Sequence, residues 1–193
     1  MNKKLDRRKK YTRMVLKDSL IALLRVKPLT KITVKEICEK ADVNRSTFYA
    51  HYQDQFDLLE KIEEEVISNI EKAFDEYDVL KDDESLELIE ILLKYAADNF
   101  DLFYTLLIIN RDDSFEKKVM KLARKYWMKN WEKMKDTDSM LYEYGGTFVI
   151  SGSIYVIKQW MVNHMDRTPR EIARLINRFK LGIKEEGSRT GNG

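Results

Sequence analysis

The sequence predicts an all-α protein in which a small N-terminal three-helix domain precedes a larger helical domain. Apolar residues recur at the 3.6-residue spacing of amphipathic helices, and no stretch shows the strict alternation that is typical of a strand. The 193 residues include only 7 Gly and 2 Pro, so few turns are available to separate long helices. A chain of this length can form one or two domains with a sizeable core.

Composition argues against several classes of protein. The single cysteine, Cys38, allows no internal disulfide and favours a reducing, cytoplasmic location. The longest uncharged run, residues 144–157, is too short to span a bilayer. The only histidines are His51 and His164, and no Cys or carboxylate lies at metal-ligand spacing near either. We therefore expect no enzyme, no metal and no cofactor.

Charge is distributed unevenly along the chain. Residues 1–50 hold 14 Lys and Arg against 5 Asp and Glu, whereas residues 51–110 hold 4 against 17. A basic segment of this kind is the electrostatic footprint of a protein that binds a polyanion. A merely solvated basic face is the alternative. The N-terminal arm carries Lys3, Lys4, Arg7, Arg8, Lys9 and Lys10.

The first two helices follow from spacing and capping signals. A helix is predicted from Arg7 to Val26, and Pro28 ends it. A second helix begins at Thr33, because Glu36 three residues later completes a capping box. The apolar positions of the first helix are Tyr11, Met14, Val15, Leu20, Leu23 and Leu24.

A tight turn leads from the second helix into a third. Asp42 can take the left-handed backbone of the turn, and Asn44 is a suitable N-cap for a helix from Arg45 to His51. Two short helices joined by such a turn form a helix-turn-helix. The residues expected to face inward are Val34, Ile37, Cys38, Val43 and Phe48. The residues expected to face outward, with side chains suited to base edges and phosphates, are Arg45, Ser46, Thr47, Tyr49 and His51.

The stretch KITVKEICEKADVNRSTFYAHYQDQFDLLEKI, residues 31–62, resembles the DNA-binding domain of TetR-family transcriptional regulators. The resemblance implies about nine helices, a helix-turn-helix domain over 1–53, and an effector-binding and dimerisation domain over 54–186. It implies that Thr33 and His51 contact phosphates and that Arg45, Ser46 and Thr47 enter the major groove. Tyr49 would touch the DNA backbone, while Tyr52 would belong to the core with its hydroxyl at the rim.

One position departs from the family pattern. Gln55 stands where the family usually has Lys, so a phosphate contact there loses its charge. Lys9 and Lys10 of the basic arm are expected to compensate.

The remaining chain is also predicted to be helical, with short connections between the helices. Further helices are predicted from the N-cap Asp54 to about Tyr77, over 85–110, from Ser114 to Lys135, from Asp138 to about Asn163, and from Thr168 onward. Residues 80–85 are expected to be a linker, and residues 99–110 to be buried. Residues 187–193 are expected to be a disordered tail.

Two further surfaces are predicted in the distal domain. Aromatic side chains there are either plain core or the lining of an effector cavity, namely Phe74, Phe103, Tyr104, Trp127, Trp131 and Phe148. Glycines inside the helix that follows Asp138 destabilise it, so they need a packing reason. That helix is apolar all round, so it is either a central core helix or one that also packs on a twin chain. The proposed dimer seam comprises Leu141, Gly145, Phe148, Gly152 and Tyr155.

The sequence therefore predicts a homodimeric regulator that binds double-stranded DNA at a palindromic operator. We expect it to be a repressor that a small-molecule effector releases. A helical protein–protein interaction module and a ligand carrier without DNA binding are the alternatives.

Overall fold

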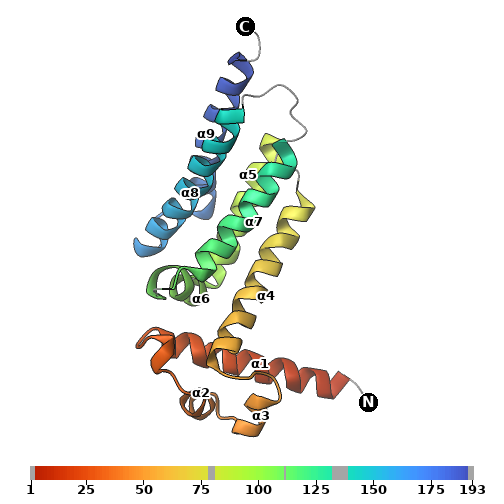
Figure 1. Ribbon diagram of the computed structural model, residues 1–193, viewed down its shortest axis with the longest axis vertical. Coiled ribbons are helices and arrows are strands. Elements are labelled where there is room, and N and C mark those ends of the chain that lie inside the picture. The colour runs from red at the N-terminus through yellow and green to blue at the C-terminus, as the bar shows by residue number, and fades with distance from the viewer. Residues whose placement is uncertain (1–2, 78–80, 111, 132–138, 191–193) are drawn as a thin grey trace.

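The computed structural model describes residues 3–77, 81–110, 112–131 and 139–190, and every regular element within these ranges is helical. The all-α prediction is thereby confirmed. Figure 1 shows a small group of helices at one end of the molecule, from which a long helix, α4, rises into a larger bundle.

The N-terminal group, here called the head, consists of three α-helices and a short 3₁₀ turn. These are α1 (Lys3–Leu24), the turn Leu29–Lys31, α2 (Val34–Ala41) and α3 (Arg45–Tyr49). Its core is built from Leu16, Leu20, Ile37 and Phe48, all fully buried. The buried face of α1 differs from the one that the apolar spacing suggested, because Tyr11 and Met14 are exposed.

Local signals set the boundaries of the short helices. Thr33 and Glu36 form the predicted capping box at the start of α2. Asp42 takes the left-handed backbone, with φ 53°. Asn44 occupies the N-cap position of α3, but its side chain makes no capping hydrogen bond. The Asp54 side chain accepts the backbone N–H groups of the first turn of α4, as predicted.

The long helices of the body pack in an order that the chain sequence does not follow. The body comprises α4 (Gln55–Glu76), α5 (Asp82–Asp98), α6 (Phe100–Tyr104), a π-helical segment (Thr105–Ile109), α7 (Ser114–Trp131), α8 (Ser139–Val162) and α9 (Pro169–Thr190). Helix α5 packs along α9, while α7 lies between α4 and α8. The head rests on the body through α1, which contacts α4 and the π-helical segment.

Two boundary predictions need correction. Helix α5 begins at Asp82, so most of the stretch 80–85 is helix rather than linker. Its run of acidic residues suits the positive end of a helix dipole, which favours a helix start there. Helix α9 continues to Thr190, so residues 187–190 are helical rather than a disordered tail.

The other distal boundaries follow the predictions where the structure describes them. The expected break between Lys135 and Asp138 lies outside the described residues, and so do the last residues, 191–193. Thr168 and Glu171 form a capping box at the start of α9, with the Glu171 backbone N–H donating to Thr168 Oγ1 at 3.3 Å. No described helix is long and apolar enough to cross a bilayer.

Candidate nucleic-acid interface and ligand cavity

The outer surface of the helix-turn-helix carries the side chains that the sequence assigned to it. Arg45 and Ser46 are exposed at the start of α3, and Thr47 beside them is half-buried. Tyr49 is 58% exposed. Phe48, one residue earlier, is fully buried, because successive helical residues point about 100° apart. The helix therefore presents a polar edge outward while one aromatic ring anchors it.

An aromatic cluster supports the C-terminal end of α3. The Phe48 ring meets Tyr49 edge-on, with centroids 5.6 Å apart, and Tyr52 at 5.7 Å. Burial raises the pKa of the half-buried Tyr52 phenol, so this residue stays protonated. Its position agrees with the prediction of a core residue at the rim of the head.

Thr33 at the start of α2 is held within a small network. Its hydroxyl donates to Glu36 Oε2 at 2.9 Å, and Lys27 Nζ donates to Glu36 Oε1 at 2.5 Å. The hydrogen bonds from Lys27 and Thr33 lower the pKa of Glu36 to about 2. A phosphate contact by the Thr33 hydroxyl would therefore require it to leave Glu36.

Positive charge gathers around His51, just after α3. Burial, followed by the positive charges of Arg13 and Lys9, lowers the pKa of this imidazole. Lys9 and Arg13 lie one helical turn apart on the same face of α1. The neutral imidazole and the two cations thus form one surface that can contact a phosphate backbone. Sequence reasoning did not single out Arg13, although its spacing from Lys9 was a usable signal.

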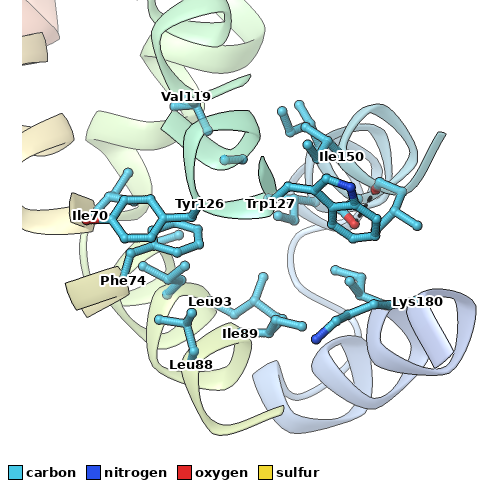
Figure 2. Close-up of a pocket in the computed structure, with 18 of the residues that line it drawn as sticks. Ile70, Phe74, Leu88, Ile89, Leu93, Val119, Tyr126, Trp127, Ile150 and Lys180 are labelled. Carbon is cyan, nitrogen blue, oxygen red and sulfur yellow. Dashed lines mark hydrogen bonds between the residues drawn. The ribbon is translucent and has the colours of Figure 1, made fainter. Parts of the chain in front are cut away.

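The body encloses an apolar cavity of about 220 Å³. Each of the long body helices contributes to its wall. The aromatic lining side chains are Phe74, Phe103, Phe115, Tyr126 and Trp127. Figure 2 shows Phe74 and Tyr126 on one side of this cavity and Lys180 on the other. The cavity can accept a small, largely apolar ligand.

Helix α8 contains three glycines, and the structure explains why residue 146 is one of them. A Cβ atom at this position would lie 2.5 Å from the indole nitrogen of Trp127. Glycine is therefore required for the close approach of α7 and α8 that places Trp127 at the cavity wall. Gly152 differs, because nothing lies within 4 Å of a Cβ built there.

Large apolar side chains are exposed along one side of α8 and α9. On α8, Phe148 is 65% and Tyr155 70% exposed, and Gly152 lies between them. Further exposed members are Tyr144, Val162, Leu175 and Phe179. We call this set the α8/α9 face. Because one side of α8 is open, the interpretation of α8 as a helix buried all round within its own chain is wrong.

A family comparison identifies the chain. Residues 83–181, more than half of the sequence, match a TetR-type family model described as "Transcriptional regulator C-terminal region". The chain belongs to the TetR family of transcriptional regulators. The members of this family are transcriptional regulators rather than enzymes. Within the described residues, no group of His, Cys, Asp and Glu could hold a metal ion.

Individual relatives agree with this assignment. An uncharacterised HTH-type transcriptional regulator of Bacillus subtilis strain 168, YxbF, is 29% identical over 96 residues, which cover 48% of this chain and 25% of that protein. The chain thus spans about a quarter of that curated relative. A TetR regulator from Streptococcus agalactiae 2603V shares the fold with a TM-score of 0.68, at 23% identity over 92% of this chain and 98% of the other. The regulator FadR of Bacillus subtilis, solved with stearoyl-CoA, has a TM-score of 0.65 at 13% identity over 86% and 95%.

The effector residues predicted for this TetR-family chain are only partly brought together. Phe74, Phe103 and Trp127 line the cavity. Tyr104 does not line this cavity, and its ring stacks on Phe100 with centroids 5.1 Å apart. Phe148 was assigned both to the ligand and to the dimer seam, and its exposure removes it from the ligand set. The side chain of Trp131 lies outside the described residues.

The residues predicted for a dimer seam differ in their exposure. Phe148, Gly152 and Tyr155 lie together on the exposed side of α8. Gly145 is buried within its own chain and adds no exposed surface. The side chain of Leu141 lies outside the described residues. Sequence reasoning did not single out α9, whose exposed Leu175 and Phe179 are spaced one helical turn apart.

Proposed function

We propose that this protein acts as a homodimer on a palindromic DNA site and leaves that site when a small molecule fills the body cavity. The exposed polar edge of α3 is the observation that carries the DNA-binding part. Arg45, Ser46 and Thr47 would read base edges in the major groove, and Tyr49 would contact the backbone. Thr33, His51 and Gln55 would add phosphate contacts, with positive charge from the N-terminal arm.

The α8/α9 face supports the homodimer. Monomeric proteins rarely expose several large aromatic side chains in one contiguous patch. A twofold interface uses the same patch on both copies, so one apolar face suffices to build it. Phe148 and Tyr155 would form its centre, with Phe179 of α9 beside them. Two heads related by a twofold axis would bind two inverted half-sites, which is why we propose a palindromic operator.

Helix α4 supports release by a ligand. Its first residue, Gln55, follows the recognition helix closely in the chain, whereas Phe74 near its other end lines the cavity. A ligand that favours one position of Phe74 would move the start of α4 with it, because a helix transmits displacement along its length. Such a ligand needs a higher affinity for the DNA-free arrangement than for the DNA-bound one. The protein would act as a repressor wherever its site overlaps a promoter.

The test starts with DNA duplexes selected from a random pool by the full-length protein. We expect an inverted repeat among the selected sequences. Fluorescence anisotropy then compares Arg45→Ala with Lys72→Ala, because each variant removes one exposed positive charge, the first from α3 and the second from α4. Arg45→Ala should weaken binding by roughly 1–3 kcal/mol and relax base preference, whereas Lys72→Ala should leave both unchanged. Equal effects of the two variants would contradict the assigned DNA surface.

A further inference from the structure

We propose that Trp127 determines the longest apolar ligand that the cavity accepts, because its indole ring separates the cavity from a second hollow between α7 and α8. Trp127 is then a specificity-determining residue of the ligand site. The inference rests on the proposed function only in taking the cavity as that site, and ligand binding is therefore measured apart from DNA release.

The second hollow, here called the α7/α8 groove, differs from the cavity in its surroundings. All of its described lining residues belong to α7 and α8. Half of them are exposed, namely Lys121, Arg124, Met128, Glu143 and Thr147. The lining of the cavity, in contrast, is mostly apolar and comes from all the long body helices. The α7/α8 groove is therefore a hydrated surface, whereas the cavity suits an apolar chain.

Two side chains belong to both spaces. Trp127 of α7 and Ile150 of α8 line the cavity and also the α7/α8 groove, and no other described residue does so. Figure 2 shows both on the side of the cavity away from Ile70 and Phe74. We call these two side chains the partition. Because both spaces reach the same two side chains, truncating either one should join the cavity to the groove.

Gly146 explains why the indole can lie at the partition. This residue lines the α7/α8 groove, and a Cβ atom built on it would lie 2.5 Å from Trp127 Nε1 and 2.8 Å from Trp127 Cδ1. Non-bonded atoms do not approach so closely, so the ring packs directly on the backbone of α8 where residue 146 has no side chain. This packing leaves no gap between Trp127 and α8 at that point.

The polar side chains of the cavity wall bond within the protein, which determines the choice of probe. Ser153 donates to a backbone carbonyl one turn earlier on α8 at 2.6 Å, and the Tyr126 hydroxyl donates to Asp75. Lys180 Nζ donates to Ser85 Oγ at 2.5 Å. A charged ligand group would lose its hydration without gaining an established partner. The primary alcohols are suitable probes, because they carry no charge and differ only in chain length.

The experiment measures affinity against chain length from 1-butanol to 1-dodecanol, by isothermal titration calorimetry on the full-length protein. While each added methylene is buried, affinity should rise about fourfold per carbon. In wild type this rise should stop at a definite length, where the chain meets the partition. In Trp127→Ala the rise should continue for at least about two more carbons, so an alcohol two carbons beyond the wild-type limit should bind about tenfold more tightly than it binds to wild type.

A matched pair of variants separates the position of a side chain from its volume. Ile150→Ala and Ile154→Ala make the same change one turn apart on α8, but Ile154 lines only the cavity. Ile154→Ala adds a closed space, whereas Ile150→Ala adds the same space and a connection to the α7/α8 groove. The limit should therefore move at least about two carbons further in Ile150→Ala than in Ile154→Ala. This comparison also keeps the test available if Trp127→Ala proves unstable.

Equal shifts in the two isoleucine variants would overturn the proposal, and so would a wild-type series without a limit or an unchanged limit in a folded Trp127→Ala. It also fails if no alcohol binds to wild type, because a partition has no role in a cavity that takes no apolar chain. Anisotropy with a selected duplex then tests release. If the limits move as expected but no alcohol releases the duplex, the role of Trp127 stands and the proposed release mechanism fails.

Discussion

Phe48 and Tyr49 are adjacent in α3, and substitution of each by alanine should damage a different property. Phe48 is fully buried in the core of the head, whereas Tyr49 is 58% exposed on its outer edge. The prediction therefore compares Phe48→Ala with Tyr49→Ala in the same protein. Phe48→Ala should unfold the head, and Tyr49→Ala should weaken DNA binding while the head stays folded.

The expected magnitudes follow from burial and contact. Removing a buried phenylalanine ring costs roughly 3–5 kcal/mol, because the transfer free energy is lost and a cavity remains. A surface substitution usually stays within about 0.5 kcal/mol. Tyr49→Ala also loses the edge-on contact with Phe48, and such aromatic pairs contribute about 0.5–1.5 kcal/mol. The two losses of head stability should thus differ by at least about 1 kcal/mol.

Hydrogen exchange of the α2 and α3 amides is the appropriate assay, because it reports on the head separately from the body. At about 1.4 kcal/mol for each tenfold change, Phe48→Ala should lower protection roughly 10²–10⁴-fold, and Tyr49→Ala by no more than about 30-fold. Anisotropy should show Tyr49→Ala weakening DNA binding by roughly 1–3 kcal/mol. Tyr49→Phe is the control for the hydroxyl. If Tyr49→Ala unfolds the head while Phe48→Ala does not, α3 is rotated from the orientation described above and the groove assignment fails with it.

Three further predictions concern the basic arm, the α8/α9 face and the capping box. The double variant Lys9→Ala/Arg13→Ala should weaken binding to all DNA sequences alike and make the affinity less dependent on salt concentration. Lys10→Ala should have a smaller effect. An unchanged salt dependence in the double variant would exclude Lys9 and Arg13 as phosphate contacts. Sedimentation should show a wild-type dimer and a weaker one in Gly152→Leu, with Gly152→Ala as the mild control, whereas a wild-type monomer at micromolar concentration would contradict the interface. Glu36, with its pKa lowered from 4.5 to about 2, stabilises the head fully above about pH 4.5 and progressively less as the pH falls through about 2. Glu36→Gln should therefore destabilise the head at pH 7, and its difference from wild type in urea unfolding should shrink toward pH 2.

The head could be predicted closely because local chemistry determines its turns. The capping box at Thr33, the left-handed Asp42 and the cap at Asp54 each depend on residues within three or four positions. The burial of Phe48 follows from helical periodicity once α3 is placed. The capping bond expected from Asn44 is absent, because a residue type favours a role at a helix start but does not enforce it. Arg13 was missed because its role depends on the approach of α1 to His51.

The body was less predictable because its surfaces depend on which helices meet. Aromatic residues occur within the helical patterns of α4, α7 and α8 alike. Phe74 and Trp127 nevertheless line the cavity, while Phe148 is exposed. Sequence patterns report that a helix has an apolar side, but not which neighbour covers it. The burial of Lys180 could not be predicted from the sequence, because a single lysine on an amphipathic helix usually lies on its solvated side. Its burial follows from the packing of α9 along α5, which no local pattern records.

In the proposed release mechanism, helix α4 is the element that connects the cavity with the head. Its 22 residues span about 33 Å, and it packs Leu58 into the core of the head and Ile70 against the cavity. Glu63 is buried midway along α4 and accepts a hydrogen bond from Lys118 of α7 at 2.7 Å, so this contact joins the two helices. A second connection runs through α6, where Asp101 pairs with Arg25, the residue after the end of α1, at 2.6 Å. A ligand that spreads α4 from α9 would therefore turn the head about the Glu63 contact. The free energy available for that turn is limited to the difference in ligand affinity between the DNA-bound and the DNA-free arrangement. An effector that binds the cavity equally well in both arrangements would therefore not release DNA.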